Sequence, residues 1–279
     1  MMTRIRKHAL KDMTFAEFRE RLSDKPVILL PFGSQEEQGP HAPMGDFMLT
    51  EAVAGQVAEA ADAIVAPTIP FGYADFFKTI AGGIQLRPST FSAVVEDTVT
   101  AFLDHGIEHI LILNGHTSNA PLFDQTLRRI RTERGVSIPF VNLWQSIPDA
   151  LWKELHGSSV AAARGHGGEP LTSIYLHLCP ELMRMDLARP SMRAKAFGLP
   201  TGGVNNVQFE GMPVHVQLNC HEVNADGMLG GDPLLASAEK GARMVEYLVG
   251  FCARFVAHMR SCDMRSVAGF IPDGTKEAS

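Results

Sequence analysis

The sequence predicts an α/β protein in which a mostly parallel sheet carries helices on both faces. Short apolar runs of strand length alternate along the chain with longer segments whose apolar residues recur at helical spacing. Polar, glycine-rich loops follow several of the apolar runs. No shift in composition divides the chain, so we expect residues 1–279 to form a single domain.

The composition is that of an ordinary globular protein and argues against several classes of partner. Hydrophobic residues make up 45% and charged residues 20% of the chain, which allows a sizeable core. The net charge of −6, without a long basic run, argues against nucleic-acid binding. No apolar run approaches the roughly 20 residues of a membrane span, and no apolar segment follows the basic cluster Arg4–Lys7 to form a signal peptide.

The four cysteines are scattered and lack the C-x-x-C spacing of a zinc or redox site. We therefore expect reduced, mostly buried thiols in a cytoplasmic protein.

The first third of the chain predicts two helices and two strands. Residues 13–22 have helical spacing, and Thr14 with Glu17 forms a candidate capping box. The other expected elements are a buried strand at Val27–Leu30, a helix at Leu49–Ala61 and a strand at Ala63–Pro67.

The middle of the chain repeats the order of helix and strand. A helix is expected from about Phe91 to His105, with Ser89 or Thr90 as its cap. Residues 107–113 form the clearest buried strand, and Pro121 suits the first turn of a helix that runs to about Glu133. Another strand is expected at 137–143.

The remaining elements are less regular. A helix is predicted at Leu171–Leu178, loops and short strands at 186–222, and a long helix from Leu234 to about Met259. The polar end, residues 273–279, is expected to be frayed.

One irregular segment, Pro31–Asp46, combines glycines and prolines with several polar side chains. It follows the first buried strand and carries Glu36, Glu37, Gln38, His41 and Asp46. Carboxylates crowded at the end of a buried strand repel one another, and a cation would offset that repulsion. The alternative interpretation is a polar surface loop with solvated charges.

Two further loops have a similar position, at Asn114–Asn119 and Arg164–Glu169. A parallel sheet would bring all three loops to one edge. Together they supply Glu36, Glu37, Asp46, His116, His166 and Glu169. Carboxylates with imidazole suit Zn²⁺, Mn²⁺ or Fe²⁺. Taken alone, His116 is better explained as a histidine that caps a helix.

The loop Pro70–Phe77 is rich in aromatic residues. Its aromatic side chains are expected either to line a substrate pocket or to join the core.

The chain resembles the creatininase (creatinine amidohydrolase) family. Residues 33–46 are similar to that family's first motif, roughly G-S-x-E-Q-H-G-P-H-x-P-x-G-T-D. Residues 114–119 resemble its N-G-H-G-G-N, residues 166–173 its H-A-G-E-x-E-T-S, and residues 231–241 its closing segment. The resemblance implies a three-layer α/β/α fold, a site with one or two metal ions, and hydrolysis of a cyclic or formyl-type amide.

The resemblance also implies roles for individual residues. Glu36 and His116 fall on metal-ligand positions, and Asp46 falls on a bridging aspartate if one residue is deleted before it. His166 falls on the proton-transfer histidine, and Glu169 on an acidic position of the third motif, as a catalytic group or metal ligand.

Three positions depart from the family pattern. Gln38 replaces a ligand histidine, Leu171 replaces an acid, and Ser118 stands where creatininase carries a glutamate. A neutral amide is a weak ligand, so either Glu37 or Glu169 takes the place of Gln38 in that role, or the site holds one ion. These departures disfavour creatinine as the substrate.

The sequence therefore predicts a metal-dependent amidohydrolase that cleaves a small-molecule C–N bond with metal-activated water, Zn²⁺ being the favoured ion. The alternative is an inactive family member that binds a small molecule or assembles. The resemblance implies a homo-oligomer, with a hexamer as one form, and Phe71, Phe76, Phe77 and Met228 are candidates for an interface or a pocket. Substrate choice is expected to lie in residues 73–78 and 204–226.

Overall fold

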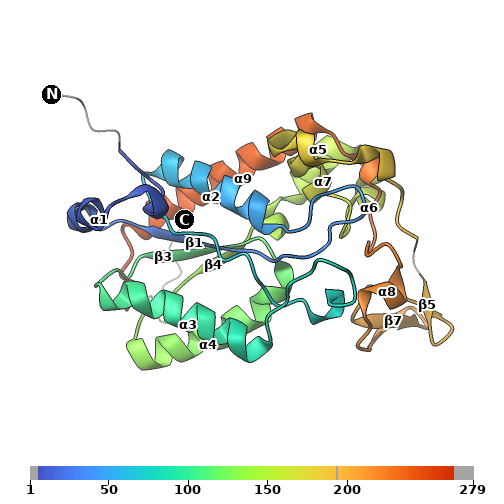
Figure 1. The fold of residues 1–279 in the computed structure, drawn as a ribbon, viewed down its shortest axis with the longest axis horizontal. Helices are drawn as coiled ribbons and strands as arrows, with labels where there is room; N and C mark the ends of the chain where they lie inside the picture. Colours follow the sequence, from blue (N-terminus) through green and yellow to red (C-terminus); the bar gives the residue numbers. More distant parts are fainter. Residues whose placement is uncertain (1–5, 193, 267–279) are drawn as a thin grey trace, which may run out of the picture.

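A four-stranded parallel sheet forms the middle of the molecule (Figure 1). The computed structural model describes residues 6–192 and 194–266. The strand order is β2 (Ile64–Val65), β1 (Ile28–Phe32), β3 (Ile110–Asn114) and β4 (Phe140–Asn142). Every residue of β1 and β3 is buried, as expected for central parallel strands covered on both faces.

Helices cover both faces of the sheet, as predicted (Figure 1). One layer contains α2 (Phe47–Ala61), α7 (Leu171–Leu178) and α9 (Ala238–Met259), and the opposite layer contains α3 (Pro88–Asp104) and α4 (Ala120–Arg134). The predicted α/β fold with a mostly parallel sheet is confirmed.

Two helix boundaries show how well local signals predict the structure. Thr14 and Glu17 do form a capping box at the start of α1 (Phe15–Arg21). The expected cap at Ser89 or Thr90 is wrong, because α3 begins at Pro88 and both residues lie inside it. Proline at a first helical position needs no intrahelical partner for its nitrogen, so the helix can start earlier than the polar residues suggest.

The last long helix begins four residues later than expected. Pro233–Leu235 forms a short 3₁₀ helix (η9), and α9 starts after Ser237, whose side chain accepts a hydrogen bond from the Lys240 amide. The sequence pattern also does not predict α5 (Asp149–His156), which forms part of the site described below.

The shorter elements connect these layers. A single α-helical turn, α6 (Val160–Ala163), precedes the third polar loop. The other 3₁₀ helices are Leu10–Asp12 (η1), Leu22–Asp24 (η2), Asp75–Phe77 (η3), Thr117–Asn119 (η4), Trp144–Ser146 (η5), Gly157–Ser159 (η6), Pro180–Leu182 (η7) and Met185–Leu187 (η8).

Residues 195–223 form a small arm at the end of the molecule where β1 and β3 terminate (Figure 1). Two antiparallel pairs build it: β5 (Lys195–Ala196) with β6 (Leu199–Pro200), and β7 (Asn206–Phe209) with β8 (Met212–His215). Helix α8 (Cys220–Val223) completes the arm. The short strands expected in this region are thus present.

The described residues contain no helix that is long and apolar enough to cross a membrane. All four cysteines are free; Cys220 and Cys252 are buried, and Cys179 and Cys262 are partly exposed. Arg4 of the basic cluster and the polar end at 273–279 lie outside the described residues.

Candidate active site

Glu36, Asp46 and His116 meet at the carboxyl ends of β1 and β3. One potential ligand atom from each lies within 4.8 Å of the others. His116 Nδ1 is 3.1 Å from Glu36 Oε1 and 3.1 Å from Asp46 Oδ2. All three residues are at most 4% exposed. The fold thus brings His116 of the second polar loop to Glu36 and Asp46 of the first, as predicted from the loop positions.

The backbone around His116 fixes which ring nitrogen faces the carboxylates. His116 Nε2 lies 3.0 Å from the carbonyl oxygen of Tyr73. A carbonyl only accepts, so Nε2 donates, and the neutral ring keeps its lone pair on Nδ1. That lone pair points toward the oxygens of Glu36 and Asp46, as a metal-binding histidine requires.

Ser34 holds the Asp46 carboxylate in place, mainly through the oxygen that does not face His116. Asp46 precedes α2, but its side chain turns back toward β1 instead of capping the helix. Asp46 Oδ1 accepts a hydrogen bond from the Ser34 amide at 2.6 Å, and Ser34 Oγ lies 3.3 Å from Oδ2. Oδ2 therefore remains the oxygen that faces His116.

The protonation of the cluster reflects burial and mutual charge. Burial raises the pKa of Asp46 to about 6, although His116 acts in the opposite direction. Burial also opposes the charged form of Glu36, but the charge of His116 lowers the pKa of that carboxyl. Burial disfavours protonated His116 as well, yet Glu36 and Asp46 raise its pKa well above the ordinary value. Without another cation, the carboxylates depend on a protonated imidazole.

The arrangement fits a divalent cation. Two ligands at about 2.1 Å from an ion and separated by 90–110° lie roughly 3.0–3.4 Å apart, which matches both 3.1 Å separations. Glu36 Oε2 is buried and has no hydrogen-bond partner among the described residues. An ion would compensate this carboxylate and take the place of the proton on His116 Nδ1.

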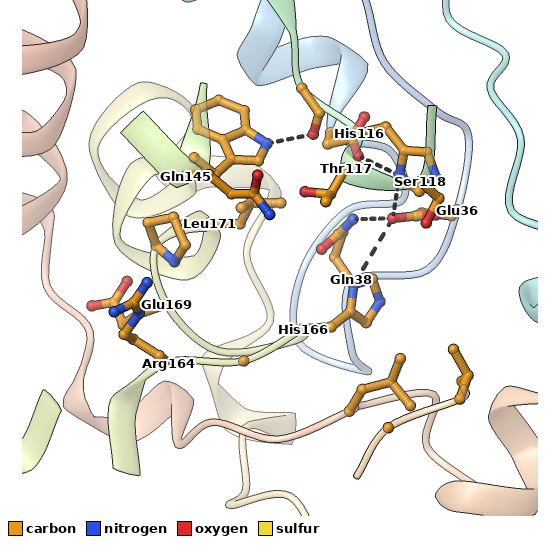
Figure 2. A pocket seen from close by; sticks show the side chains of 18 of the residues that line it. Glu36, Gln38, His116, Thr117, Ser118, Gln145, Arg164, His166, Glu169 and Leu171 are labelled. Atoms are coloured by element: carbon orange, nitrogen blue, oxygen red, sulfur yellow. Dashed lines mark hydrogen bonds and ion pairs between the residues drawn. The ribbon is translucent and has the colours of Figure 1, made fainter. Parts of the chain in front are cut away.

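Gln38 lies beside the cluster (Figure 2). Its amide nitrogen donates to Glu36 Oε1 at 3.2 Å. Its carbonyl oxygen is buried without a partner among the described residues. Gln38 thus orients Glu36, and it stands where the family pattern has a histidine.

Glu37 points away from the three-residue cluster and pairs with His166. His166 Nε2 donates to Glu37 Oε1 at 2.8 Å, and Glu37 Oε2 accepts from the Gly39 amide at 2.7 Å. His166 Nδ1 then faces the cluster, 3.9 Å from Glu36 Oε1. Burial lowers the pKa of His166, but the Glu37 carboxylate outweighs it and raises the value to about 8.

Two neighbours fix this pair. The His166 ring stacks on Phe77, with centroids 4.5 Å apart. A Cβ at Gly227 would lie 2.2 Å from Glu37 Cδ, so only glycine leaves room for the carboxylate. Glu37 is therefore built in as a partner of His166, and the structure does not place it among the potential metal ligands.

Glu169 lies outside the cluster of Glu36, Asp46 and His116. Its carboxylate accepts from the Ser173 hydroxyl and from the Ser173 amide, at 3.2 Å for the amide. His156 Nε2 is 3.4 Å from Glu169 Oε1. The acid expected at this position therefore has local partners on α7 and α5, contrary to the expectation that it reaches the ion with Glu36.

A cavity of about 500 Å³ opens above the cluster. Its walls come from the three polar loops, from η3 and η5, from α5 and from the arm. Phe76 and Phe77 line it while Phe77 is also buried, so the aromatic loop serves both the core and the cavity. Met228 is fully buried and Phe71 is 36% exposed.

Several cavity residues were not assigned a role from the sequence. They are Trp144, Gln145, Trp152 and Arg164. Trp144 follows the end of a predicted strand, and Arg164 begins a predicted site loop. The position of each residue in the sequence could therefore have indicated that it lines the site. Trp152 had no such signal because α5 was not predicted.

The comparison with known proteins agrees with this geometry. The family model described as creatininase, creatinine amidohydrolase, matches residues 11–256. The chain belongs to the creatininase family. The predicted relationship is therefore confirmed, and the chain is a hydrolase of that family.

Individual relatives differ in what they act on. The chain is 28% identical over 278 residues to 3-dehydro-scyllo-inosose hydrolase of Thermotoga maritima, covering 93% of this chain and 85% of that protein. It is 28% identical over 190 residues to creatinine amidohydrolase of Pseudomonas putida, covering 63% and 73%. It is 27% identical over 246 residues to a mycofactocin precursor peptide peptidase of Mycolicibacterium smegmatis, covering 84% and 86%.

Solved creatininase structures share the fold. One creatinine amidohydrolase has a TM-score of 0.75 at 22% identity, over 93% of this chain and all of that one. A structure named creatininase Mn gives 0.74 at 24% identity, over 91% and 98%. A mutant creatininase of Zn–Zn type gives 0.73 at 23%, over 91% and 98%.

Proposed function

We propose that this protein is a metal-dependent amidohydrolase in which Glu36, Asp46 and His116 hold one divalent cation. The observation that carries the proposal is the convergence of two carboxylate oxygens and a correctly oriented imidazole nitrogen within 4.8 Å. When bound there, the ion supplies Lewis acidity, which polarises a carbonyl and lowers the pKa of water. Zn²⁺ is the favoured ion and Mn²⁺ the next, because both suit mixed carboxylate and imidazole ligands.

The proposal of a single ion agrees with the contacts of the other candidate metal ligands, which already have partners elsewhere or are weak ligands. Glu37 is committed to His166, and Glu169 to Ser173. Gln38 contributes an amide, which is a weak ligand. Ser118 and Leu171 bring no carboxylate to the cavity wall. A second ion would therefore lack anionic ligands.

His166 is the group we assign to proton transfer. Its Nε2 is held by Glu37, and its Nδ1 faces the Glu36 side of the cavity. Nδ1 can take a proton from the attacking water and give it to the leaving nitrogen. A pKa of about 8 leaves both protonation states accessible near neutral pH. Phe77, stacked on the ring, limits its rotation and excludes water from that face.

Metal analysis tests the proposal directly. Protein purified without chelator should contain about one equivalent of Zn²⁺ or Mn²⁺ by plasma mass spectrometry. Asp46→Asn and His116→Ala should lose the ion, whereas the exposed control His105→Ala should keep it. An equal metal content in all four proteins would contradict the site, and two equivalents would contradict the single ion.

Activity is the second arm of the test. A panel of lactams and N-formyl amides, with creatinine included, is incubated with metal-loaded protein, and the release of amine or carboxylate is measured. Turnover should require the ion and fall by at least about 100-fold in His166→Ala. Tight, stoichiometric metal binding without turnover of any panel member would favour a binding protein instead.

We further propose that the protein self-associates through its arm. Three apolar side chains of the arm are at least half exposed, Phe197 at 80%, Phe209 at 51% and Met212 at 69%, and Met192, which precedes the arm in sequence, is 82% exposed. A surface of this kind is typical of interfaces between copies. Light scattering after size exclusion should give a mass that is a multiple of 30.4 kDa, and a monomer would contradict the proposal.

A further inference from the structure

The cavity has two chemically different ends. Figure 2 shows Glu36, Gln38, His116 and His166 on one side and Arg164 with Glu169 on the other, separated by Gln145 and Leu171. The first side carries the candidate metal ligands. Among the described residues that line the cavity, Arg164 alone carries a permanent positive charge.

The Arg164 guanidinium is positioned but poorly compensated. It lies over the Trp152 ring, 4.7 Å from its centroid, and Trp152 itself is only 1% exposed. The rigid aromatic face fixes the guanidinium plane. In the described part of the chain, its ion pair is with Asp149, 3.6 Å from Nη1 to Oδ1.

Neither nearby acid neutralises this cation. The Asp149 side chain is 97% exposed, so this long contact is a solvated surface pair of little energetic value. The Glu169 carboxylate is fully buried and occupied by Ser173, with His156 adjacent. Arg164 therefore keeps most of its five N–H donors for another anion.

The chain also limits how far this anion can lie from the reaction centre. Arg164 and His166 are two residues apart in one loop, so their Cα atoms are no more than about 7 Å apart. Helix α5 places Trp152 behind the guanidinium, and the same loop carries the proton-transfer histidine. A small substrate that contacts both residues therefore spans this cavity, with its anionic group at the Arg164 end and its amide at the end that carries His166.

We propose that Arg164 binds a carboxylate of the substrate, which is an amide or lactam bearing that carboxylate a few bonds from the carbonyl. This inference rests on the proposed function, because the metal end defines where the amide lies. A planar guanidinium binds a carboxylate through two parallel hydrogen bonds, which adds orientation to affinity. A cavity of about 500 Å³ accommodates such a molecule in full.

Binding of simple acids tests the proposal without knowledge of the substrate. Glutarate and pentanoate have the same chain length, but only glutarate has a second carboxylate. Calorimetry with Zn²⁺-loaded protein should give at least about tenfold tighter binding of glutarate. Arg164→Gln should reduce this ratio to about one, and Arg164→Lys should leave an intermediate ratio because it keeps charge without the planar fork.

The matched control is Arg243→Gln, since Arg243 is exposed on α9 and paired with Glu154. It should keep the glutarate preference of the natural protein. Equal binding of the two acids, or a preference that survives in Arg164→Gln, would overturn the inference.

Metal content measured on the same samples separates this inference from the proposed function. Normal Zn²⁺ content with no glutarate preference overturns the anion site alone. Absence of Zn²⁺ overturns the metal proposal, and the acids are then compared on the metal-free protein, where a preference lost in Arg164→Gln would still support the anion site and equal binding would overturn it.

Discussion

At the scale of single residues, three hydrogen bonds orient the site. Tyr73 directs His116 Nδ1, Ser34 directs Asp46 Oδ2, and Glu37 directs His166 Nδ1 toward one space. Each partner occupies the opposite atom of the functional group. Preorganisation by such partners reduces the cost of ordering the site during the reaction.

Glu37→Gln tests this role of Glu37. The amide can still accept a hydrogen bond, but it stabilises a charged imidazole less than a carboxylate does. We expect kcat to fall by about 10- to 100-fold with metal content unchanged. Steady-state kinetics with metal analysis measures both quantities.

The control for this change is Glu133→Gln, on the exposed face of α4. It removes the same charge at a distance from the cavity and should leave kcat unchanged. Loss of the ion in Glu37→Gln would mean that Glu37 is a metal ligand after all.

At the scale of elements, the site depends on where strands end and helices begin. β1 and β3 deliver Glu36 and His116, and α2 begins directly after Asp46. The third loop is fixed between α6 and α7, and α7 packs against α9. The start of α9 therefore bears on the position of the loop that carries His166.

Ser237→Ala tests the start of α9. Ser237 Oγ accepts from the Lys240 amide, and its own amide donates to Ser173 Oγ, the partner of Glu169. Loss of the cap should lower the free energy of unfolding by about 1 kcal/mol. Urea denaturation followed by circular dichroism measures this change.

The exposed Ser158→Ala in η6 provides the comparison, since Ser158 caps no long helix. The free energy of unfolding of this variant is expected to lie within about 0.5 kcal/mol of that of the natural protein. If Ser237→Ala behaved in the same way, the cap would contribute nothing measurable to α9.

At the scale of the whole molecule, the proposed ion would link the loop that follows β1, which carries Glu36 and Asp46, to the loop that follows β3, which carries His116. An ion that binds only the folded state stabilises it by about 2.7 kcal/mol at 100 times its dissociation constant. Chelator should therefore lower the melting temperature, and Zn²⁺ should restore it. Differential scanning fluorimetry measures both shifts.

Glu36→Gln supplies the control for this stabilisation. It weakens the proposed site, so its melting temperature should respond little to chelator or to Zn²⁺. A Zn²⁺-dependent increase of equal size in this variant would place the stabilising ion elsewhere on the protein.

Thiol reactivity reports on the packing of the whole chain. Burial raises the pKa of Cys252 to about 12 and also raises that of Cys220, so neither forms the reactive thiolate near neutral pH. In native protein, DTNB should modify Cys179 and Cys262, which are partly exposed. Peptide mapping identifies the sites, and rapid labelling of Cys252 would contradict the packing of α9.

The sequence by itself determined the alternating elements, the parallel sheet and the family. Strand and helix periodicity are local properties of the chain, and the segments 33–46, 114–119 and 166–173 carry the family pattern. The same local signals identified Glu36, Asp46 and His116 as candidates, because polar side chains at the ends of buried strands meet at one sheet edge.

Only the tertiary structure decided how the remaining polar residues divide among roles. Glu36 and Glu37 are neighbours in sequence, yet one faces His116 and the other faces His166. Glu169 pairs with Ser173, and Arg164 packs on Trp152 of α5, a helix that the sequence pattern does not predict. The direction in which each polar side chain points, and the partner it binds, depend on contacts between distant segments of the chain. Local periodicity does not encode those contacts.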